Sequence, residues 1–124
     1  MDWAVENVNN MIRNDDLIRL ISFKQQKTFS LSSPKVVVGQ IASGDQFFSN
    51  NEEKKNLLTL LPEVLCVEME GAAVAQVCFE YKVPYVIIRT ISDESNENSV
   101  VDFNEFVTQV ASKFGVAIIQ KLIQ

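Results

Sequence analysis

Apolar residues recur at helical spacing at both ends of the chain. Residues 3–21 carry apolar side chains three or four positions apart, and a break at Asn14-Asp15-Asp16 predicts one or two amphipathic helices there. Towards the C-terminus a single long helix is predicted by one apolar stripe, which consists of Phe103, Phe106, Val107, Val110, Phe114, Ala117, Ile118 and Leu122. The polar stretch 23–34 predicts a connection or an edge strand.

The middle of the chain predicts buried strands that alternate with helices. The apolar runs Lys35–Ala42, Val64–Glu68 and Val83–Ile91 are typical of strands covered on both faces. Short helices are expected at about residues 53–61 and from Glu70 onward, where apolar positions 74, 77, 78 and 81 have helical spacing. This alternation predicts an α/β fold with a largely parallel sheet, although the strands are few for such a sheet.

Length and charge narrow the class of protein. The 124 residues predict a single domain that spans 1–124, with residues 1–34 as a helical or linker lead-in. The net charge of −5 argues against nucleic acid as a partner, because no basic stripe is present. No apolar run is long enough to span a membrane and no signal peptide is recognisable, so a cytoplasmic protein without a membrane partner is expected.

The inventory of reactive side chains is small. Cys66 and Cys78 both lie in apolar contexts, which favours reduced thiols, although a disulfide stays open. The chain contains no histidine, so acid–base chemistry must rest on carboxylates. No phosphate-binding glycine loop and no zinc spacing occurs, so neither a cofactor nor a metal is expected.

Polar residues follow each predicted strand, at the edge where parallel sheets bind ligands. They form three clusters: Ser43-Gly44-Asp45, Glu68-Met69-Glu70, and Arg89 with Ser92-Asp93. A guanidinium such as that of Arg89 inside an apolar strand needs an anionic partner. Simpler roles compete with a binding role, because Glu68 and Glu70 can favour the positive end of the next helix and Asp93 can stabilise a turn.

Three stretches together resemble the C-terminal half of the nucleoside phosphorylase/nucleosidase superfamily: GQIASGDQFF, VEMEGAAVAQVCFEYKVPYVIIRTISD and VDFNEF. Within it the methylthioadenosine/S-adenosylhomocysteine nucleosidases are the most similar, over roughly residues 35–124. The resemblance implies a partial phosphorylase/hydrolase-like three-layer sandwich with a mainly parallel central sheet and with the N-terminal half missing. It also implies a cytoplasmic homodimer in methionine salvage that hydrolyses the N-glycosidic bond of 5′-methylthioadenosine and S-adenosylhomocysteine and releases adenine.

The resemblance assigns the catalytic roles to four residues. Asp93 would be the general acid that protonates N7 of the leaving purine, with Ser92 orienting it. Glu70 would accept hydrogen bonds from the ribose 2′ and 3′ hydroxyls, and Arg89 would lie beside the ribose and the attacking water. These residue types suit the reaction, because positive charge develops on the sugar while the departing base must be neutralised.

The resemblance places four further residues against the substrate. Phe47 would stack on the adenine, and the backbone of Phe48 would hydrogen-bond its edge. Met69 would pack on the ribose, and Phe103 would line the pocket for the 5′-alkylthio group. Phenylalanines at 47 and 48 can equally be plugs of an apolar core, so that alternative stays open.

One part of the family pattern has no counterpart in this sequence. The glutamate that activates the attacking water lies in the family's N-terminal half, and residues 1–34 do not match it. We therefore expect weak or no hydrolysis by the chain alone, and either a homo-oligomer or association with a missing N-terminal half. The alternatives are phosphorolysis of the purine nucleoside phosphorylase type and a non-catalytic purine-nucleoside-binding remnant.

Overall fold

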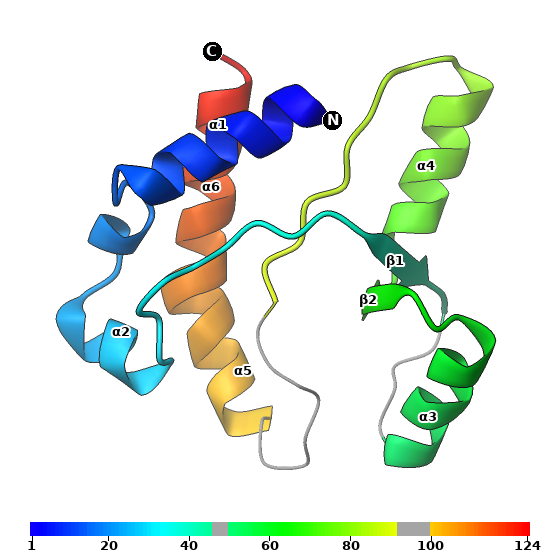
Figure 1. Cartoon of the computed structure of the whole chain (residues 1–124), viewed down its shortest axis with the longest axis horizontal. Helices are drawn as coiled ribbons and strands as arrows, with labels where there is room; N and C mark the ends of the chain where they lie inside the picture. The colour runs from blue at the N-terminus through cyan, green and yellow to red at the C-terminus, as the bar shows by residue number, and fades with distance from the viewer. Residues whose placement is uncertain (46–49, 92–99) are drawn as a thin grey trace. The chain divides into compact units, whose positions relative to one another are not determined.

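The computed structural model describes residues 1–45, 50–91 and 100–124 (Figure 1). These residues form two compact units. The first, which we call the helical unit, comprises the described residues of 1–37 and 92–124; the second, which we call the α/β unit, comprises those of 38–91. The predicted combination of helices with a parallel sheet is confirmed in its coarse form.

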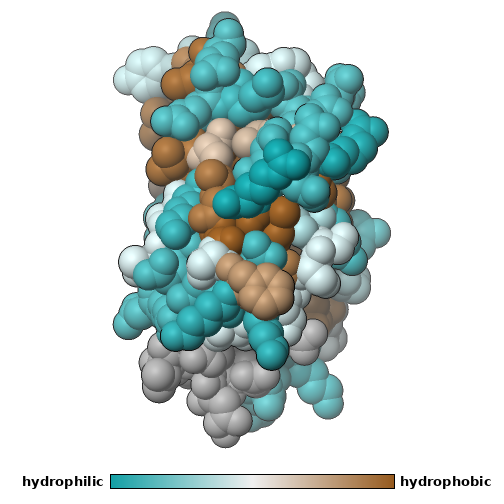
Figure 2. All heavy atoms as spheres, turned by 90° about the vertical axis from the view of Figure 1, so that its left-hand side faces the viewer, coloured by the Kyte–Doolittle hydropathy of each residue, from teal (hydrophilic) through white to brown (hydrophobic). Residues whose placement is uncertain are grey.

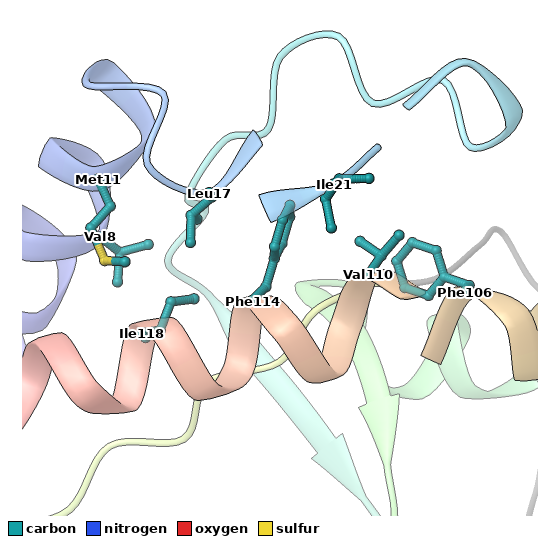
Figure 3. Close-up of a cluster of buried hydrophobic side chains, with 8 residues drawn as sticks. All are labelled: Val8, Met11, Leu17, Ile21, Phe106, Val110, Phe114 and Ile118. Atoms are coloured by element: carbon teal, nitrogen blue, oxygen red, sulfur yellow. The ribbon is translucent and has the colours of Figure 1, made fainter. Parts of the chain in front are cut away.

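The helical unit is built from three helical segments in its N-terminal part and one long, continuous helical segment in its C-terminal part. Its elements are α1 (Asp2–Arg13), the short 3-10 helix η1 (Ile18–Leu20), α2 (Phe23–Thr28), α5 (Val100–Phe106), the π-helical segment η2 (Val107–Ala111) and α6 (Ser112–Leu122). Their core is one cluster of buried apolar side chains (Figure 3): Val8, Met11, Leu17, Ile21, Phe106, Val110, Phe114 and Ile118. Both predicted apolar stripes therefore face each other in this core.

The predicted break at Asn14-Asp15-Asp16 is confirmed. Helix α1 ends at Arg13, Asp15 has a positive φ of 60°, and the amide of Asp16 donates to the Met11 carbonyl at 2.8 Å. The prediction for 23–34 was wrong over its first half, because α2 occupies Phe23–Thr28. Ser22 begins this helix by accepting a hydrogen bond from the Gln25 amide at 3.3 Å, which is the N-cap arrangement that stabilises short helices.

The predicted C-terminal helix is confirmed, with one local change in winding. The π-helical segment η2 lies between α5 and α6, and the fully buried Val110 belongs to it. A π-helical turn is wider than an α-helical one, so it helps residues four apart to stay on one side of the helix. Phe106, Val110 and Phe114 are buried in this way, whereas Phe103 and Val107 of the predicted stripe are exposed.

The α/β unit contains a two-stranded parallel sheet with one helix after each strand (Figure 1). Its elements are β1 (Gln40–Ser43), α3 (Asn51–Leu60), β2 (Val64–Glu68) and α4 (Gly71–Glu80). The register pairs Ile41 with Cys66 and Ser43 with Glu68, so both strands end side by side. The strand at 64–68 and the two helices agree with the sequence pattern.

Two of the strand predictions need correction. The run Lys35–Ala42 yields a strand only from Gln40, and the run Val83–Ile91 forms no strand among the described residues. The reason is pairing: a strand requires a neighbour with which to exchange backbone hydrogen bonds, and in this part of the chain β1 and β2 pair only with each other. Arg89 consequently lies in an irregular segment rather than in a strand.

The two units differ in how well they bury apolar side chains. On the side of the helical unit that carries α1 and α2, polar side chains surround a limited apolar area (Figure 2). In the α/β unit only Gly71 of α4 is buried, while Leu65 and Val67 on β2 and Val77 and Phe79 on α4 are exposed. Within the described ranges, no helix has both the length and the apolar character needed to cross a membrane.

Candidate functional site

Polar side chains meet where the two strands end and α4 begins. Ser43 is the last residue of β1, Glu68 is the last residue of β2, and the sheet register places these two opposite each other. Two residues later Glu70 occupies the N-cap position of α4, which begins at Gly71. The predicted convergence of polar residues at the carboxyl ends of parallel strands is therefore present for these two strands.

The Glu68 carboxylate is the centre of this cluster. Its Oε2 accepts hydrogen bonds from the Glu70 amide at 3.1 Å and from the Gly71 amide at 2.7 Å, and it also forms an ion pair with Nη2 of Arg89. The side chain is only 7% exposed. Glu68 thus satisfies two amides at the start of α4 and neutralises a cation at the same time, two roles that charged acceptors fill well.

Gly71 is required by the position of that carboxylate. A Cβ atom at residue 71 would lie 2.7 Å from Oε1 and 3.0 Å from Cδ of Glu68. Any larger residue would therefore push the carboxylate away from the amides that it accepts from. The glycine that follows Met69-Glu70 in the sequence is explained by this close approach rather than by an unusual φ angle.

Ser43 joins β1 to the same cluster. Its Oγ accepts a hydrogen bond from the Ala72 amide at 3.0 Å. Ser43 is the main cause, ahead of the Gly71 and Glu70 amides and Arg89, of the lowering of the Glu68 pKa from 4.5 to about 2, and burial partly opposes this. Among the described residues, Oε1 of Glu68 has no hydrogen-bond partner.

Arg89 links the buried carboxylate to an exposed one. Its Nη2 lies 3.2 Å from Oε2 of Glu70, whose side chain is 72% exposed, against 35% for Arg89 itself. One guanidinium therefore faces two carboxylates, and the second of these is open to solvent and to a ligand. The expectation that Arg89 needs an anionic partner is confirmed, with Glu68 as the partner that sequence reasoning did not assign to it.

The charges of Glu68 and Arg89 affect the thiol of Cys66. Burial raises the pKa of the Cys66 thiol, Glu68 raises it further, and Arg89 lowers it. Cys66 and Cys78 are both free and partly buried, which agrees with the prediction of reduced thiols.

The structure places some of the predicted site residues in contact with one another. For the others that it describes, it shows no such contact. Glu70 and Arg89 are in contact, and Met69 beside them is 45% exposed. Phe103 lies on α5 of the helical unit, where it is exposed. The remaining predicted residues lie outside the described ranges: Phe47, Phe48, Ser92 and Asp93.

The simpler role predicted for Glu68, at the positive end of the next helix, is confirmed by its hydrogen bonds to the Glu70 and Gly71 amides. Sequence reasoning missed its ion pair with Arg89. One signal for the role at the helix end was present: an acidic residue stands three positions before Gly71, and a glycine opening a helix leaves room for a side chain that folds back over it. Its partner Arg89 is 21 residues further along the chain, which no local pattern indicates.

Chemically, the exposed Glu70 carboxylate can accept hydrogen bonds from hydroxyl groups, and Met69 offers an adjacent apolar surface. The cluster contains two carboxylates and one guanidinium, so its surroundings favour neutral or cationic groups over anions. In the part of the chain that the structure describes, no group of three His, Cys, Asp or Glu residues could hold a metal ion.

Comparisons with known proteins give a consistent result. Residues 8–124 match the family model described as "Phosphorylase superfamily". A protein of Shewanella pealeana named 5′-methylthioadenosine/S-adenosylhomocysteine nucleosidase is 37% identical over 106 residues, which is 86% of this chain and 46% of that protein. Proteins of the same name from Buchnera aphidicola and Listeria monocytogenes are 45% and 36% identical, over 72% and 76% of this chain and 40% of each protein.

The chain thus spans less than half the length of these curated relatives. No solved structure matches it significantly.

Proposed function

The chain belongs to the phosphorylase superfamily, and we propose that it serves the hydrolysis of the N-glycosidic bond of 5′-methylthioadenosine and S-adenosylhomocysteine, with release of adenine. The names of the similar proteins support this reaction class. The observation that carries the proposal in this chain is the exposed Glu70 carboxylate, paired with Arg89 at the start of α4 beside the exposed Met69.

In this proposal Glu70 exchanges its contact with Arg89 for the 2′ and 3′ hydroxyls of the ribose. A carboxylate so placed strengthens its hydrogen bonds as positive charge develops on the sugar. Met69 packs on the ribose, and Arg89 balances the charge of the carboxylates nearby. By the family resemblance, Asp93 protonates N7 of the purine and Ser92 orients it.

The same resemblance suggests roles for three aromatic residues. Phe47 stacks on the adenine, Phe48 contacts its edge through the backbone, and Phe103 lines the pocket for the 5′ substituent. We further propose that the two-stranded sheet forms part of a three-layer sandwich with additional parallel strands. Exposed apolar side chains on β2 and α4, such as Leu65 and Phe79, support the idea that another chain or a second copy covers this unit.

The test is an adenine-release assay on this chain with 5′-methylthioadenosine, with and without added phosphate. Hydrolysis requires turnover that is independent of phosphate and that falls at least about a hundredfold in Glu70→Gln and Asp93→Asn, as the loss of a transition-state contact or of a general acid would cause. Glu80→Gln is the matched control, because Glu80 is an exposed glutamate at the far end of α4. It should leave turnover unchanged.

The alternatives give different results in the same assay. Turnover that requires phosphate would indicate phosphorolysis. Binding of 5′-methylthioadenosine without adenine release, unaffected by Asp93→Asn, would indicate a non-catalytic binding module. If neither release nor binding occurs with the chain alone or with a co-expressed polypeptide covering the rest of the relatives' length, the proposal is wrong.

A further inference from the structure

The buried carboxylate of Glu68 shares its cation, Arg89, with the proposed substrate-binding carboxylate of Glu70. Glu68 and Glu70 are two residues apart, yet the Glu68 side chain is 7% exposed and the Glu70 side chain is 72% exposed. Arg89 contacts both of them through the same nitrogen, Nη2. The guanidinium that contacts Glu70 is therefore also held by its ion pair with Glu68.

Glu68 also fixes the backbone that carries Glu70. Its Oε2 accepts from the Glu70 and Gly71 amides, at 3.1 and 2.7 Å, and Ser43 on the neighbouring strand accepts from the next amide, that of Ala72. Three successive amides at the start of α4 are thus tied to the ends of β2 and β1. This matters in the α/β unit because α4 buries little else: among its residues only Gly71 is buried.

We propose that Glu68 is a positioning residue of this site, which holds the Arg89 guanidinium and the amides of residues 70 and 71 so that the Glu70 carboxylate stays in one place for the sugar hydroxyls. The inference rests on the proposed function for its substrate class. Glu68 itself touches no substrate in this scheme. It acts through Arg89 and Glu70, and it neutralises Arg89 so that Glu70 is free to exchange that contact for a ligand.

The perturbation is Glu68→Gln, which keeps the shape and one acceptor oxygen but removes the charge that pairs with Arg89. Hydrogen bonds to charged groups are the strong ones, so kcat/KM for 5′-methylthioadenosine should fall about ten- to hundredfold. A double-mutant cycle with Glu70→Gln separates positioning from general damage. If Glu68 acts through Glu70, adding Glu68→Gln to Glu70→Gln should cost almost nothing further.

Additive losses in that cycle would overturn the proposal, as would an unchanged kcat/KM in Glu68→Gln. Glu80→Gln removes the same charge from an exposed site on α4 and should change none of these values. Ser43→Ala weakens the same network from β1 without a change of charge, and a smaller loss with the same dependence on Glu70 is expected. Far-ultraviolet circular dichroism shows whether Glu68→Gln folds. If it folds poorly, Ser43→Ala still tests the proposal.

A readout without substrate keeps this inference separate from the proposed function. Because Glu68 raises the pKa of the Cys66 thiol and Arg89 lowers it, alkylation of Cys66 should become faster in Glu68→Gln and slower in Arg89→Gln. Peptide mapping separates Cys66 from Cys78. If the chain neither binds nor cleaves 5′-methylthioadenosine, the proposed function is wrong. Opposite changes in the Cys66 alkylation rate in the two variants would still support the placement of Glu68 against Arg89. Unchanged alkylation rates in both variants would refute that placement.

Discussion

Replacing Gly71 with alanine tests whether the Glu68 carboxylate really lies over the start of α4. The new Cβ would stand 2.7 Å from Oε1 and 3.0 Å from both Cδ and Oε2 of Glu68. Contacts this short cannot persist, and the backbone of the helix cannot yield as easily as the side chain. The carboxylate should therefore move away from the Glu70 and Gly71 amides, which it accepts from at 3.1 and 2.7 Å.

The expected cost combines the weakened hydrogen bonds of Glu68 with the higher helix propensity of alanine. A hydrogen bond to a charged group contributes about 1.5–3 kcal/mol. Alanine recovers up to about 0.5–1 kcal/mol relative to glycine in a helix. The net loss at the first turn of α4 is then about 1–2 kcal/mol, which corresponds to about five- to thirtyfold in the local opening equilibrium.

Amide hydrogen exchange resolves this change by residue, because it reports local opening separately in the two units. Exchange at residues 70 to 72 should accelerate by that factor in Gly71→Ala. Gly115→Ala is the matched control, since Gly115 lies inside α6 and no atom lies within 4 Å of an added Cβ. There the propensity gain of about 0.5–1 kcal/mol should slow exchange in α6 about two- to fivefold. Unchanged or slower exchange at residues 70 to 72 in Gly71→Ala would refute the reasoning.

Three further predictions concern charge, core and capping. Since the Glu68 pKa is lowered to about 2 from 4.5, its stabilisation is complete above pH 4.5 and is lost as pH falls towards 2; protection of the α4 amides should fall over that range, and an equal fall in Glu68→Gln would contradict this. Phe114→Ala should cost about 3–5 kcal/mol in urea unfolding followed by Trp3 fluorescence, whereas Phe103→Ala on the same helical stripe should cost under about 0.5 kcal/mol; equal effects would contradict the burial pattern. Ser22→Ala should lower helicity and cost about 1 kcal/mol, and no measurable loss would exclude the cap.

The sequence predicts the helical unit well because its signals are local. Apolar residues three or four apart identify a helix whatever it packs against, so the segments from Asp2 to Leu20 and from Val100 to Leu122 are found with their buried sides. The missed helix at Phe23–Thr28 has a weak apolar pattern, but Ser22 and Gln25 form the serine-x-x-glutamine sequence of a capping box. That short motif was the available signal.

Strands are predicted less well because a strand depends on its neighbour. Val64–Glu68 is a strand because Gln40–Ser43 pairs with it, whereas the equally apolar Val83–Ile91 has no such partner among the described residues. Sequence composition cannot distinguish these two cases. The same limit applies to the site, where the family motif indicates Glu70 and Arg89 but no local rule indicates that Glu68 binds the same guanidinium.

In the α/β unit, few apolar side chains are buried, so the polar cluster at the strand ends contributes much of what holds α4 in place. Helix α4 buries only Gly71, so hydrogen bonds and charge at its first turn must hold it where a packed core normally would. The Arg89–Glu70 pair is largely exposed and therefore weak in water. A chain that covered the exposed Leu65 and Phe79 would supply the apolar packing that this unit lacks.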